Sequence, residues 1–309
     1  MPEQIAELSS GQYSLLYNTF SLVIVSMLFT GLFLVLARER VLPKYRIALL
    51  LSATVVFIAA YHYFRIFDNF NEAFESTTQS GVGAYGATTT QFNEGYRYVD
   101  WLLTVPLLLA ETVAVLALAK AEQRRLLWKL IPASALMIIL GYPGELSGET
   151  GTRLFWGTLS TLPFLYILYV LFVEMGRSLE RQPREVVHTI KMLRLALVGL
   201  WGVYPIAYLA PVVGFDGADS FVVRNVGYAL ADIGAKAAFG LVIYKIARVK
   251  SELEAPGLLD AGEFPGRDRE SLPVQAGVYD SVEQQAVGGR DEINADGARR
   301  DDRGYSPTG

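Results

Sequence analysis

Residues 221–244 read FVVRNVGYALADIGAKAAFGLVIY, an apolar stretch with Lys236 near its middle and Asp232 four residues before it. A stretch of this length spans a bilayer as one helix, and an ionisable side chain at its centre costs about 3 kcal/mol on insertion scales. The spacing puts Asp232 on the same helical face as Lys236, one turn away. A desolvated lysine also forms a Schiff base with an aldehyde readily. The stretch therefore predicts a membrane helix whose lysine has either an ion-pair partner or a covalent task.

The composition indicates a membrane protein. The chain has 309 residues, of which 52% are hydrophobic and 19% charged, and its mean hydropathy is +0.30. The net charge of -4 does not favour nucleic acid as a partner. The absence of cysteine removes disulfides and thiolate chemistry, and two histidines, His62 and His188, are too few for a histidine-based metal cluster, so we expect no metal site. The polar, acidic first dozen residues do not resemble a cleavable signal.

Apolar stretches long enough to cross a bilayer recur along the chain, and no alternating ten-residue pattern indicates a barrel. They predict an all-α membrane protein, a seven-transmembrane-helix bundle within residues 13–250. We expect the fourth span to be short and interrupted near Pro132 and Gly141. The predicted spans cover residues 13–37, 45–67, 95–119, 126–142, 154–176, 189–211 and 221–248.

The distribution of basic residues predicts the orientation of this bundle. Segments 1–12, 68–94 and 211–220 contain no lysine or arginine. Because basic loops stay in the cytoplasm, we expect an extracellular N-terminus at residues 1–12 and a cytoplasmic C-terminus. The loops after spans one, three and five carry the basic residues Arg38, Arg40, Lys44, Arg46, Lys120, Arg124, Arg125, Lys129, Arg177, Arg181, Arg184, Lys191 and Arg194, with His188 among the last group.

Two segments fall outside the predicted membrane spans. Residues 68–94 are rich in Thr, Ser, Gly and Asn, which favours an extracellular loop or hairpin. Residues 251–309 are rich in Gly, Asp, Glu, Arg and Pro and have few large apolar residues. This composition predicts a disordered cytoplasmic tail, with a folded interaction domain as the alternative.

The third span concentrates charge inside an apolar helix. It reads RYVDWLLTVP at residues 97–106 and continues to Glu111. Asp100 and Thr104 are one turn apart, and Glu111 returns to nearly the same face about three turns, or ~16 Å, further along. With the predicted orientation, Arg97 is outermost, Asp100 is central and Glu111 is nearest the cytoplasm.

These positions suggest opposite tasks for the two carboxylates. Asp100, close to Arg97 and Lys236, should be ionised and able to accept a proton, whereas Glu111, among leucines, should keep its proton. The pair then forms an acceptor and a reservoir along one helix. The alternative is a plain ion pair between Asp100 and Arg97, with Glu111 reaching the inner interface.

These motifs together resemble the microbial (type 1) rhodopsins, over about residues 11–250. The quoted stretch at 97–106 continues as LLL, and DIGAK at 232–236 and WGVYP at 201–205 follow in the order typical of that family. Within the family, the chain is similar to the xanthorhodopsin-like branch of the proteorhodopsins. This similarity rests on YHYFR at 61–65, GYPGE at 141–145 and YILY at 166–169.

The resemblance implies all-trans retinal on Lys236 as a protonated Schiff base. Asp100 and Asp232 would be its counterions, and Asp100 would accept the proton after photoisomerisation. Glu111 would return a proton from the cytoplasmic side, and Arg97 would shape the outward exit. The implied activity is that of a light-driven ion transporter in a prokaryotic plasma membrane, multi-pass and not an enzyme.

Asp100, Thr104 and Glu111 together match the pattern of outward proton pumps in this family. A sodium pump would have Asn, Asp and Gln at these positions, and a chloride pump would lack the acid at 100. Two other functions remain open: a photosensory rhodopsin that signals through a partner, and a retinal-free seven-helix transporter with a buried ion pair.

The resemblance also implies a binding pocket. His62 would hydrogen-bond Asp100, Tyr63 and Tyr204 would hydrogen-bond Asp232, and leucine at 108 accompanies green absorption. The partners would be membrane lipid, protons and further copies of the chain in a homo-oligomer, a pentamer or trimer. The retinal pocket would include Trp101, Leu108, Trp201, Tyr204, Pro205, Tyr208 and Tyr63.

Gly157 follows Trp156 on the fifth span, where many rhodopsins have a bulky aromatic residue. The resemblance implies a lateral opening beside the retinal ring, of the kind in which xanthorhodopsin-like proteins dock a carotenoid antenna. The alternative is close helix packing, since small residues are common between membrane helices.

Overall fold

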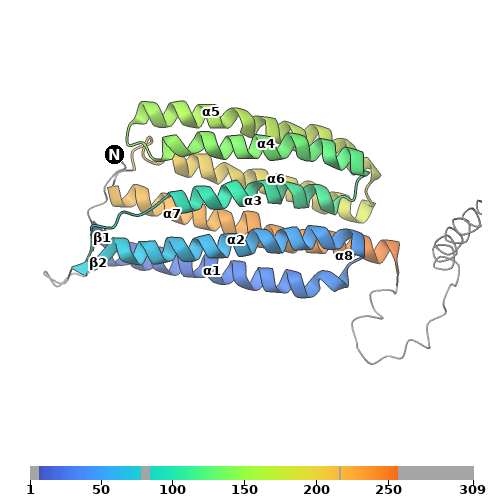
Figure 1. Ribbon diagram of the computed structural model, residues 1–309, viewed down its shortest axis with the longest axis horizontal. Helices are drawn as coiled ribbons and strands as arrows, with labels where there is room; N and C mark the ends of the chain where they lie inside the picture. Colours follow the sequence, from blue (N-terminus) through green and yellow to red (C-terminus); the bar gives the residue numbers. More distant parts are fainter. Residues whose placement is uncertain (1–6, 78–83, 216, 257–309) are drawn as a thin grey trace, which may run out of the picture. The chain divides into compact units, whose positions relative to one another are not determined.

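The protein is an antiparallel bundle of long helices (Figure 1). The structure, a computed structural model, describes residues 7–77, 84–215 and 217–256. Seven helices within these ranges are long and apolar enough to cross a membrane. The predicted seven-transmembrane-helix bundle is therefore confirmed.

Six of the seven spans are longer than the apolar stretches that predicted them, whereas the third ends at Val115, before the predicted residue 119. The seventh consists of three consecutive elements, α7, η5 and α8, and the fifth continues from α5 through η3 and η4. The bounds are α1 Ser10–Ala37 with η1 Arg38–Arg40, α2 Pro43–Ala73, α3 Gly95–Val115, α4 Lys120–Glu145, α5 Thr150–Tyr169, η3 Val170–Glu174, η4 Met175–Arg181, α6 Arg184–Tyr208, α7 Gly217–Asp232, η5 Ile233–Ala238 and α8 Phe239–Glu254.

The fourth helix corrects one prediction. We expected an interruption near Pro132 and Gly141, but α4 is continuous. Proline is tolerated inside membrane helices because nearby side chains and local adjustments satisfy the freed backbone groups.

The basic segment after the fifth span is also shorter than predicted. His188, Lys191 and Arg194 belong to α6 and not to a loop. Arg194 is buried and donates to the carbonyl of Leu171, at 2.9 Å. Hydropathy marks only the apolar part of a span, so polar helical turns beyond it are assigned to loops.

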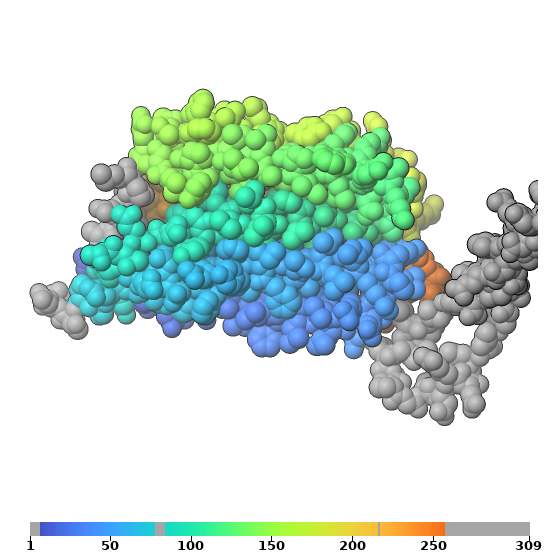
Figure 2. Space-filling model, in the orientation of Figure 1, coloured from blue at the N-terminus to red at the C-terminus, as the bar shows by residue number. Residues whose placement is uncertain are grey.

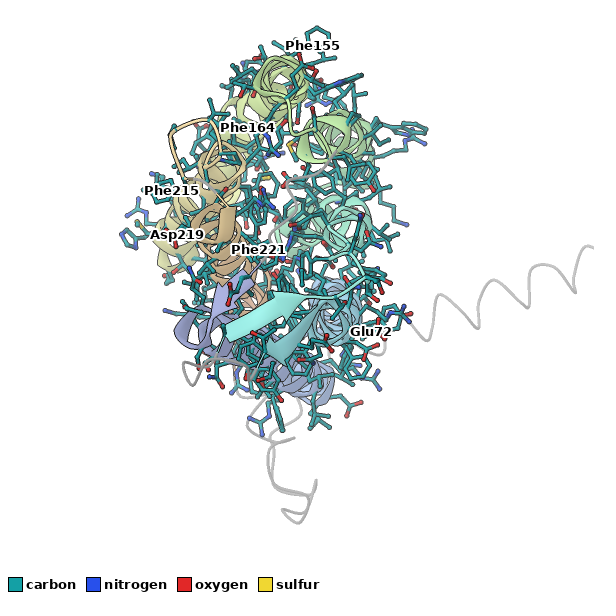
Figure 3. All side chains as sticks on the ribbon, turned by 90° about the vertical axis from the view of Figure 1, so that its left-hand side faces the viewer. Glu72, Phe155, Phe164, Phe215, Asp219 and Phe221 are labelled. Atoms are coloured by element: carbon teal, nitrogen blue, oxygen red, sulfur yellow. The ribbon has the colours of Figure 1, made fainter. Side chains whose placement is uncertain are left out.

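A small sheet covers the end of the bundle where α1 begins. In the segment 68–94, α2 continues to Ala73 and is followed by β2 (Phe74–Thr77) and β3 (Ala84–Ala87), which pair antiparallel. Strand β1 (Glu7–Ser9) pairs with the other edge of β3, which gives the order β1-β3-β2. Figure 3 looks onto this end, with the strands in front.

The N-terminal strand passes directly into the first helix. Ser9 and Gln12 form a capping box, in which each side chain accepts a hydrogen bond from the other's backbone N–H. The ring of Tyr13 stacks on that of Tyr85, with centroids 3.7 Å apart. These contacts fix the sheet to the start of α1. The predicted tail at 251–309 is described only as far as residue 256, and the remainder lies outside the described residues.

At the end of the bundle away from the sheet, the ammonium group of Lys250 links the end of α3 to the segment before α6. Its Nζ donates to the carbonyls of Val115 and Leu116, both at 3.0 Å, and to Gln182 Oε1 at 2.8 Å. The last carbonyls of α3 are thereby satisfied by a cation, which suits the negative end of a helix dipole. This junction holds the end of α3 that carries Glu111.

The outer faces of the helices are apolar. In the space-filling view, α2, α3, α4 and α5 form one broad side of the bundle (Figure 2). Phe155 lies on the outer side of α5 (Figure 3), 62% exposed, and Ile206 and Leu36 are also exposed. Apolar faces of this kind fit contact with lipid, and the chain is a multi-pass membrane protein.

Candidate functional site

The centre of the bundle holds one lysine between two carboxylates. Lys236 belongs to η5, where the helix widens to a π-turn, a feature that is frequent at functional sites. Its Nζ contacts Asp100 Oδ2 and lies 3.2 Å from Asp232 Oδ1. All three side chains are almost completely buried. A buried ammonium group is tolerated only with such partners, so the three groups form one unit.

The surroundings of the two carboxylates differ. Asp232 accepts hydrogen bonds from the Tyr63 hydroxyl at 2.7 Å, the Tyr204 hydroxyl at 2.6 Å and the Trp101 indole N–H at 3.3 Å. Asp100 uses Oδ2 for Lys236, while its Oδ1 has no hydrogen bond within the described residues. Asp232 is therefore fixed by three donors, and Asp100 keeps an oxygen available for a proton.

His62, predicted to hydrogen-bond Asp100, and Thr104, one turn from it, both lie beside Asp100 but bond to the backbone. His62 Nδ1 is 2.9 Å from the Ile58 carbonyl and 4.0 Å from Asp100 Oδ1. The Thr104 hydroxyl donates to the backbone carbonyl of Asp100, at 2.8 Å. His62 is thus within ion-pairing distance of the acid, although its hydrogen bond goes to its own helix.

Arg97 connects this centre to the end of the bundle that carries the sheet. It donates to the Tyr63 hydroxyl at 3.0 Å and to Asn225 Oδ1 at 2.7 Å, and its Nε lies 3.7 Å from Glu94. It therefore reaches Asp232 through Tyr63. The simple pair between Arg97 and Asp100 that we considered is not among its contacts in the described chain.

Glu111 lies on α3 on the other side of Asp100 from Arg97, away from the other charged groups. Its side chain is fully buried, and neither oxygen makes a hydrogen bond within the described residues. Ser52 is the polar side chain that faces it. The alternative in which Glu111 reaches the inner interface is therefore wrong.

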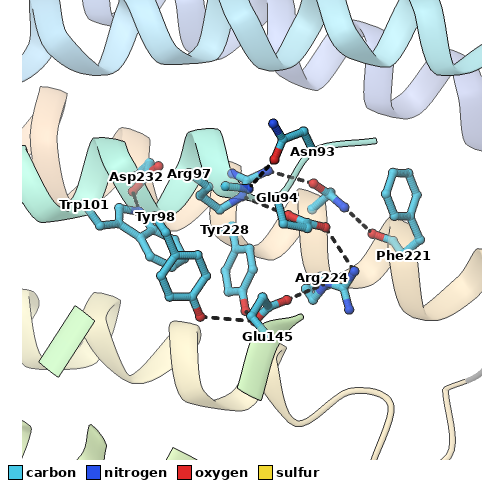
Figure 4. A network of polar contacts seen from close by, with 12 residues as sticks. Asn93, Glu94, Arg97, Tyr98, Trp101, Glu145, Phe221, Arg224, Tyr228 and Asp232 are labelled. Carbon is cyan, nitrogen blue, oxygen red and sulfur yellow. Dashed lines mark hydrogen bonds and ion pairs between the residues drawn. The ribbon is translucent and has the colours of Figure 1, made fainter. Parts of the chain in front are cut away.

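Sequence analysis missed a cluster on the far side of Arg97 (Figure 4). Arg224 lies between two carboxylates, 3.0 Å from Glu94 Oε1 and 3.3 Å from Glu145 Oε1. Arg153 approaches Glu145 from α5, at 3.9 Å. Arg224 was visible as a charge inside the apolar stretch at 221–244, and such a charge indicates a buried partner.

An apolar pocket begins at Lys236. Most of the residues predicted for the pocket line it, whereas Tyr63 lies behind Asp232 and is not part of the lining. Such a space, with an amine in its wall, suits an apolar aldehyde. The pocket is lined by Tyr98, Trp101, Val105, Leu108, Met137, Ile138, Gly141, Gly157, Ser160, Thr161, Phe164, Trp201, Tyr204, Pro205, Tyr208, Tyr228 and Lys236.

Some of these lining residues were not expected. Tyr228 lies eight residues before Lys236, about two helical turns, so helical spacing could have placed it on the same face. Met137 and Phe164 come from α4 and α5, and no local pattern links them to the lysine. Phe164 points between the helices in Figure 3, in contrast to Phe155.

Gly157 lies where α5 approaches Tyr208 of α6. A Cβ atom at this position would be 2.9 Å from Tyr208 Cε1, and a Cβ at Gly144 would overlap the Tyr208 hydroxyl. That hydroxyl donates to the carbonyl of Arg153, at 2.8 Å. Gly157 therefore serves close packing, the alternative that we considered, and it also lines the pocket.

Fold and site together define a seven-helix membrane protein with a lysine and two carboxylates at the wall of an aromatic pocket. The model of the bacteriorhodopsin-like protein family matches residues 15–249. The chain belongs to this family and is a microbial type 1 rhodopsin.

Known relatives cover more than half of this chain. The chain is 30% identical over 233 residues to a green-light absorbing proteorhodopsin from a gamma-proteobacterium, which is 74% of this chain and 85% of the relative. It is 36% identical over 180 residues to the bacteriorhodopsin of Halobacterium salinarum, 56% of this chain and 66% of the relative.

Solved rhodopsin structures also match this chain over most of its length. The structure of xanthorhodopsin, described as a light-driven ion pump with dual chromophore, is 48% identical and has a TM-score of 0.76, covering 81% of this chain and 99% of that one. A thermophilic rhodopsin is 46% identical and has a TM-score of 0.78, covering 82% and 100%.

Proposed function

We propose that the protein is a light-driven outward proton pump that binds all-trans retinal on Lys236. The observation that carries the proposal is the position of Lys236, between Asp100 and Asp232 and at the wall of an aromatic pocket. Membership of the bacteriorhodopsin-like family and the ion pump among the similar structures support it.

The residues present fit retinal. Lys236 Nζ supplies the amine, Trp101 and Trp201 supply flat apolar walls, and the two carboxylates balance a cation at the nitrogen. When bound, retinal would absorb light and change its shape by isomerisation. All proton-handling groups of the proposed cycle belong to the chain itself.

Asp100 is the acceptor in this proposal. A proton leaving Lys236 Nζ can pass directly to Asp100 Oδ2, because these atoms are in contact. The nitrogen loses one positive charge and the carboxylate one negative charge, so the buried site keeps its net charge. Asp232, held by Tyr63 and Tyr204, stays in place during the transfer.

Glu111 is the donor in this proposal. It lies about three turns from Asp100 on the same helix, and its burial without a hydrogen-bond partner in the described chain favours the neutral acid. Its carboxyl group would supply the proton that restores Lys236 and would regain one from the cytoplasm. The two transfers together would move one proton across the bundle per cycle.

The direction of transport follows from the proposed orientation. Basic residues gather in the turns at the end of the bundle away from the sheet. By the positive-inside rule, this end is cytoplasmic. Asp100 then faces outward through Arg97, and Glu111 lies on the cytoplasmic side. These turns carry Arg38, Arg40, Lys44, Lys120, Arg124, Arg125, Arg177, Arg181 and Arg184.

A carotenoid antenna at Gly157 is a further part of the proposal. Gly157 and Thr161 border the pocket on α5, and xanthorhodopsin, which this chain resembles in structure, has a dual chromophore. Since Tyr208 packs on Gly157, the carotenoid would lie against the outer edge of this contact. Excitation of bound carotenoid should drive photochemistry of retinal, measured as an added band in the action spectrum of pumping.

Light-dependent acidification tests the proposal. Cells that express the full chain and receive retinal should acidify an unbuffered medium on illumination, and a protonophore should abolish the change. Alkalinisation would contradict the outward direction. A coloured protein that moves no proton would favour the photosensory alternative, in which a buried Glu111 has no evident task.

Lys236→Ala tests the attachment of retinal. The variant should be colourless in the same cells, whereas Lys245→Ala, which alters a lysine nine residues along the same span, should keep the pigment. A retained pigment in Lys236→Ala would contradict the linkage. No pigment in the unaltered chain would favour the retinal-free transporter.

A further inference from the structure

We propose that Lys250 is a positioning residue for proton uptake, which holds the last turn of α3 closed over Glu111. The inference rests on the proposed function and deepens it, because it names the contact that must open before the donor can regain its proton. Lys250 lies on α8, at the end of the bundle where α3 also ends (Figure 1). The proposed relay of protons does not use this lysine.

Lys250 is a buried cation that binds neutral oxygen atoms. It is 3% exposed, and the three N–H donors of its ammonium group go to the carbonyls of Val115 and Leu116 and to Gln182 Oε1. Gln182 also donates through Nε2 to the Leu116 carbonyl, at 3.2 Å. One ammonium group and one amide therefore tie the end of α3 both to α8 and to the turn that precedes α6.

The charged groups around Lys250 are engaged with one another. Glu254, one turn further along α8, pairs with Lys44 and accepts a hydrogen bond from the Tyr45 hydroxyl. The ring of Tyr45, from the first turn of α2, lies 4.8 Å from Lys250 Nζ. The hydrogen bonds of Lys250 are thus free to serve the backbone of α3, which ends with unsatisfied carbonyls.

The backbone just beyond these carbonyls is strained. Ala117 has a φ of 50°, in the left-handed region that alanine rarely adopts. Such a conformation persists where the surrounding structure holds it. Here the two preceding carbonyls are held by Lys250, and one of them also by Gln182. Loss of these contacts should therefore let the last turn of α3 relax.

This turn separates Glu111 from the end of the bundle. Val115 lies one turn, about 6 Å, beyond Glu111 on α3. Val115 and Leu116 are buried in the same apolar cluster as Ile246, which lies one turn before Lys250 on α8. Glu111 is fully buried and does not meet external water in this closed arrangement. A route opens when the last turn of α3 leaves α8, and this movement breaks the contacts of Lys250.

Lys250 keeps its own proton throughout uptake. A hydronium ion from the cytoplasm gives a proton to an oxygen of the Glu111 carboxylate, which becomes the neutral acid, and a water molecule remains. While the turn is open, the hydrogen bonds of Lys250 are exchanged for bonds to water. The population of this locally open state then sets the rate at which Glu111 regains its proton.

Flash experiments on the purified full chain with retinal, in lipid nanodiscs, test the inference. In the Glu111→Gln background, the proton that restores Lys236 must come from cytoplasmic water, so the rate should rise in proportion to the bulk proton concentration. Adding Lys250→Met, which keeps the length of the side chain and removes its donors, should speed this step on the order of tenfold at any one pH. Loss of one hydrogen bond to a charged group changes an opening equilibrium by about this factor.

Two further variants in the same background are matched controls. Lys245→Met, at an exposed lysine of the same helix, should leave the rate unchanged. Lys250→Arg, which keeps a cation with several donors, should stay close to the slow rate. A residue that only stabilises the fold would lower the thermal bleaching midpoint without this acceleration.

Hydrogen–deuterium exchange in the dark gives a second measurement. Backbone amides of residues 114–119 should exchange faster in Lys250→Met, whereas those at the start of α1, at the other end of the bundle, should not change. If Lys250→Met forms no pigment, Gln182→Ala decides. It removes one acceptor of the ammonium group and one donor to Leu116, and should speed the return of the proton by about threefold.

The outcomes separate the two proposals. An unchanged or slower return of the proton in the pigment of Lys250→Met, or of Gln182→Ala in its place, would overturn the role of Lys250 while the unaltered chain still pumps. This holds even if exchange is faster, since the contact would then stabilise the turn without controlling uptake. An unaltered chain that forms pigment but takes up no proton would overturn the proposed function, and the inference with it.

Discussion

Asp100 and Asp232 illustrate how neighbours give one residue type two tasks. Both carboxylates contact the same ammonium group. Asp232 is held by two hydroxyls and an indole N–H, whereas Asp100 has an oxygen without a hydrogen bond in the described structure. A carboxylate with several donors loses more when its charge is removed, because those donors are then left in a buried site.

The two asparagine variants should therefore differ. Asp100→Asn should form a pigment with absorption shifted to the red and no light-driven acidification, because the acceptor is missing. Asp232→Asn should mainly lower stability, by about 3 kcal/mol, since it breaks a buried charged pair and leaves one of the two tyrosine hydroxyls without its acceptor. Thermal bleaching of the pigment measures the second effect. Equal stability of the two variants would contradict this ranking.

Glu111 should control the late part of the photocycle. In Glu111→Gln the return of the proton to Lys236 should slow by on the order of 10²-fold, because a positioned acid is lost. Flash absorbance measures this step directly. Glu185→Gln, at an exposed glutamate at the start of α6, is the matched control. Unchanged late kinetics in Glu111→Gln would remove the residue from the relay.

Among the elements, α4, α5 and α6 meet around a single ring. Tyr208 of α6 fits between Gly144 of α4 and Gly157 of α5, and its hydroxyl is bonded to the Arg153 carbonyl. The Arg153 guanidinium lies 5.0 Å above the same ring. Small residues here allow the backbones to approach closely, as is common between membrane helices.

Alanine at Gly144 should disturb this contact. Its Cβ would overlap the Tyr208 hydroxyl, and overpacking of this kind costs about 1–3 kcal/mol. Gly202→Ala on α6 meets nothing within 4 Å, so it should be neutral or slightly stabilising. The thermal bleaching midpoint of each pigment distinguishes them. A stable Gly144→Ala with unchanged pocket absorption would show that Tyr208 moves without cost.

For the molecule as a whole, the proposed direction of pumping depends on the distribution of charge along the bundle. The sheet covers one end, and the basic turns lie at the other. The exposed apolar faces between them fit contact with lipid. Reversed insertion would turn the same relay into an inward pump, so orientation is a property that needs its own test.

Cysteine labelling can measure the orientation, since the chain contains no cysteine of its own. Glu75→Cys in β2 and Glu39→Cys in η1 place an exposed thiol at opposite ends of the bundle. In intact cells, a membrane-impermeant maleimide should label Glu75→Cys and should reach Glu39→Cys only after lysis. The opposite pattern would reverse the proposed direction.

Local patterns along the chain were sufficient for the seven spans and for the central charges. Hydropathy over about 20 residues reports the bilayer directly, and helical spacing relates Asp232 to Lys236 and Asp100 to Glu111. The resemblance then pointed to Tyr63 and Tyr204 as partners of Asp232, and the structure contains both hydrogen bonds. Polar helical turns beyond the hydrocarbon, as at Lys191, were assigned wrongly because they carry no apolar signal.

Other features depend on how distant segments pack. Glu94, Glu145 and Arg224 come from three separate parts of the chain, and no spacing along the sequence relates them. The pairing of β1 with β3 likewise joins residues 7–9 to 84–87. Seven helices can be read from the sequence because a membrane span is a local property. A polar network between helices is a product of their mutual positions, and for this reason only the folded bundle reveals the charged cluster around Arg224.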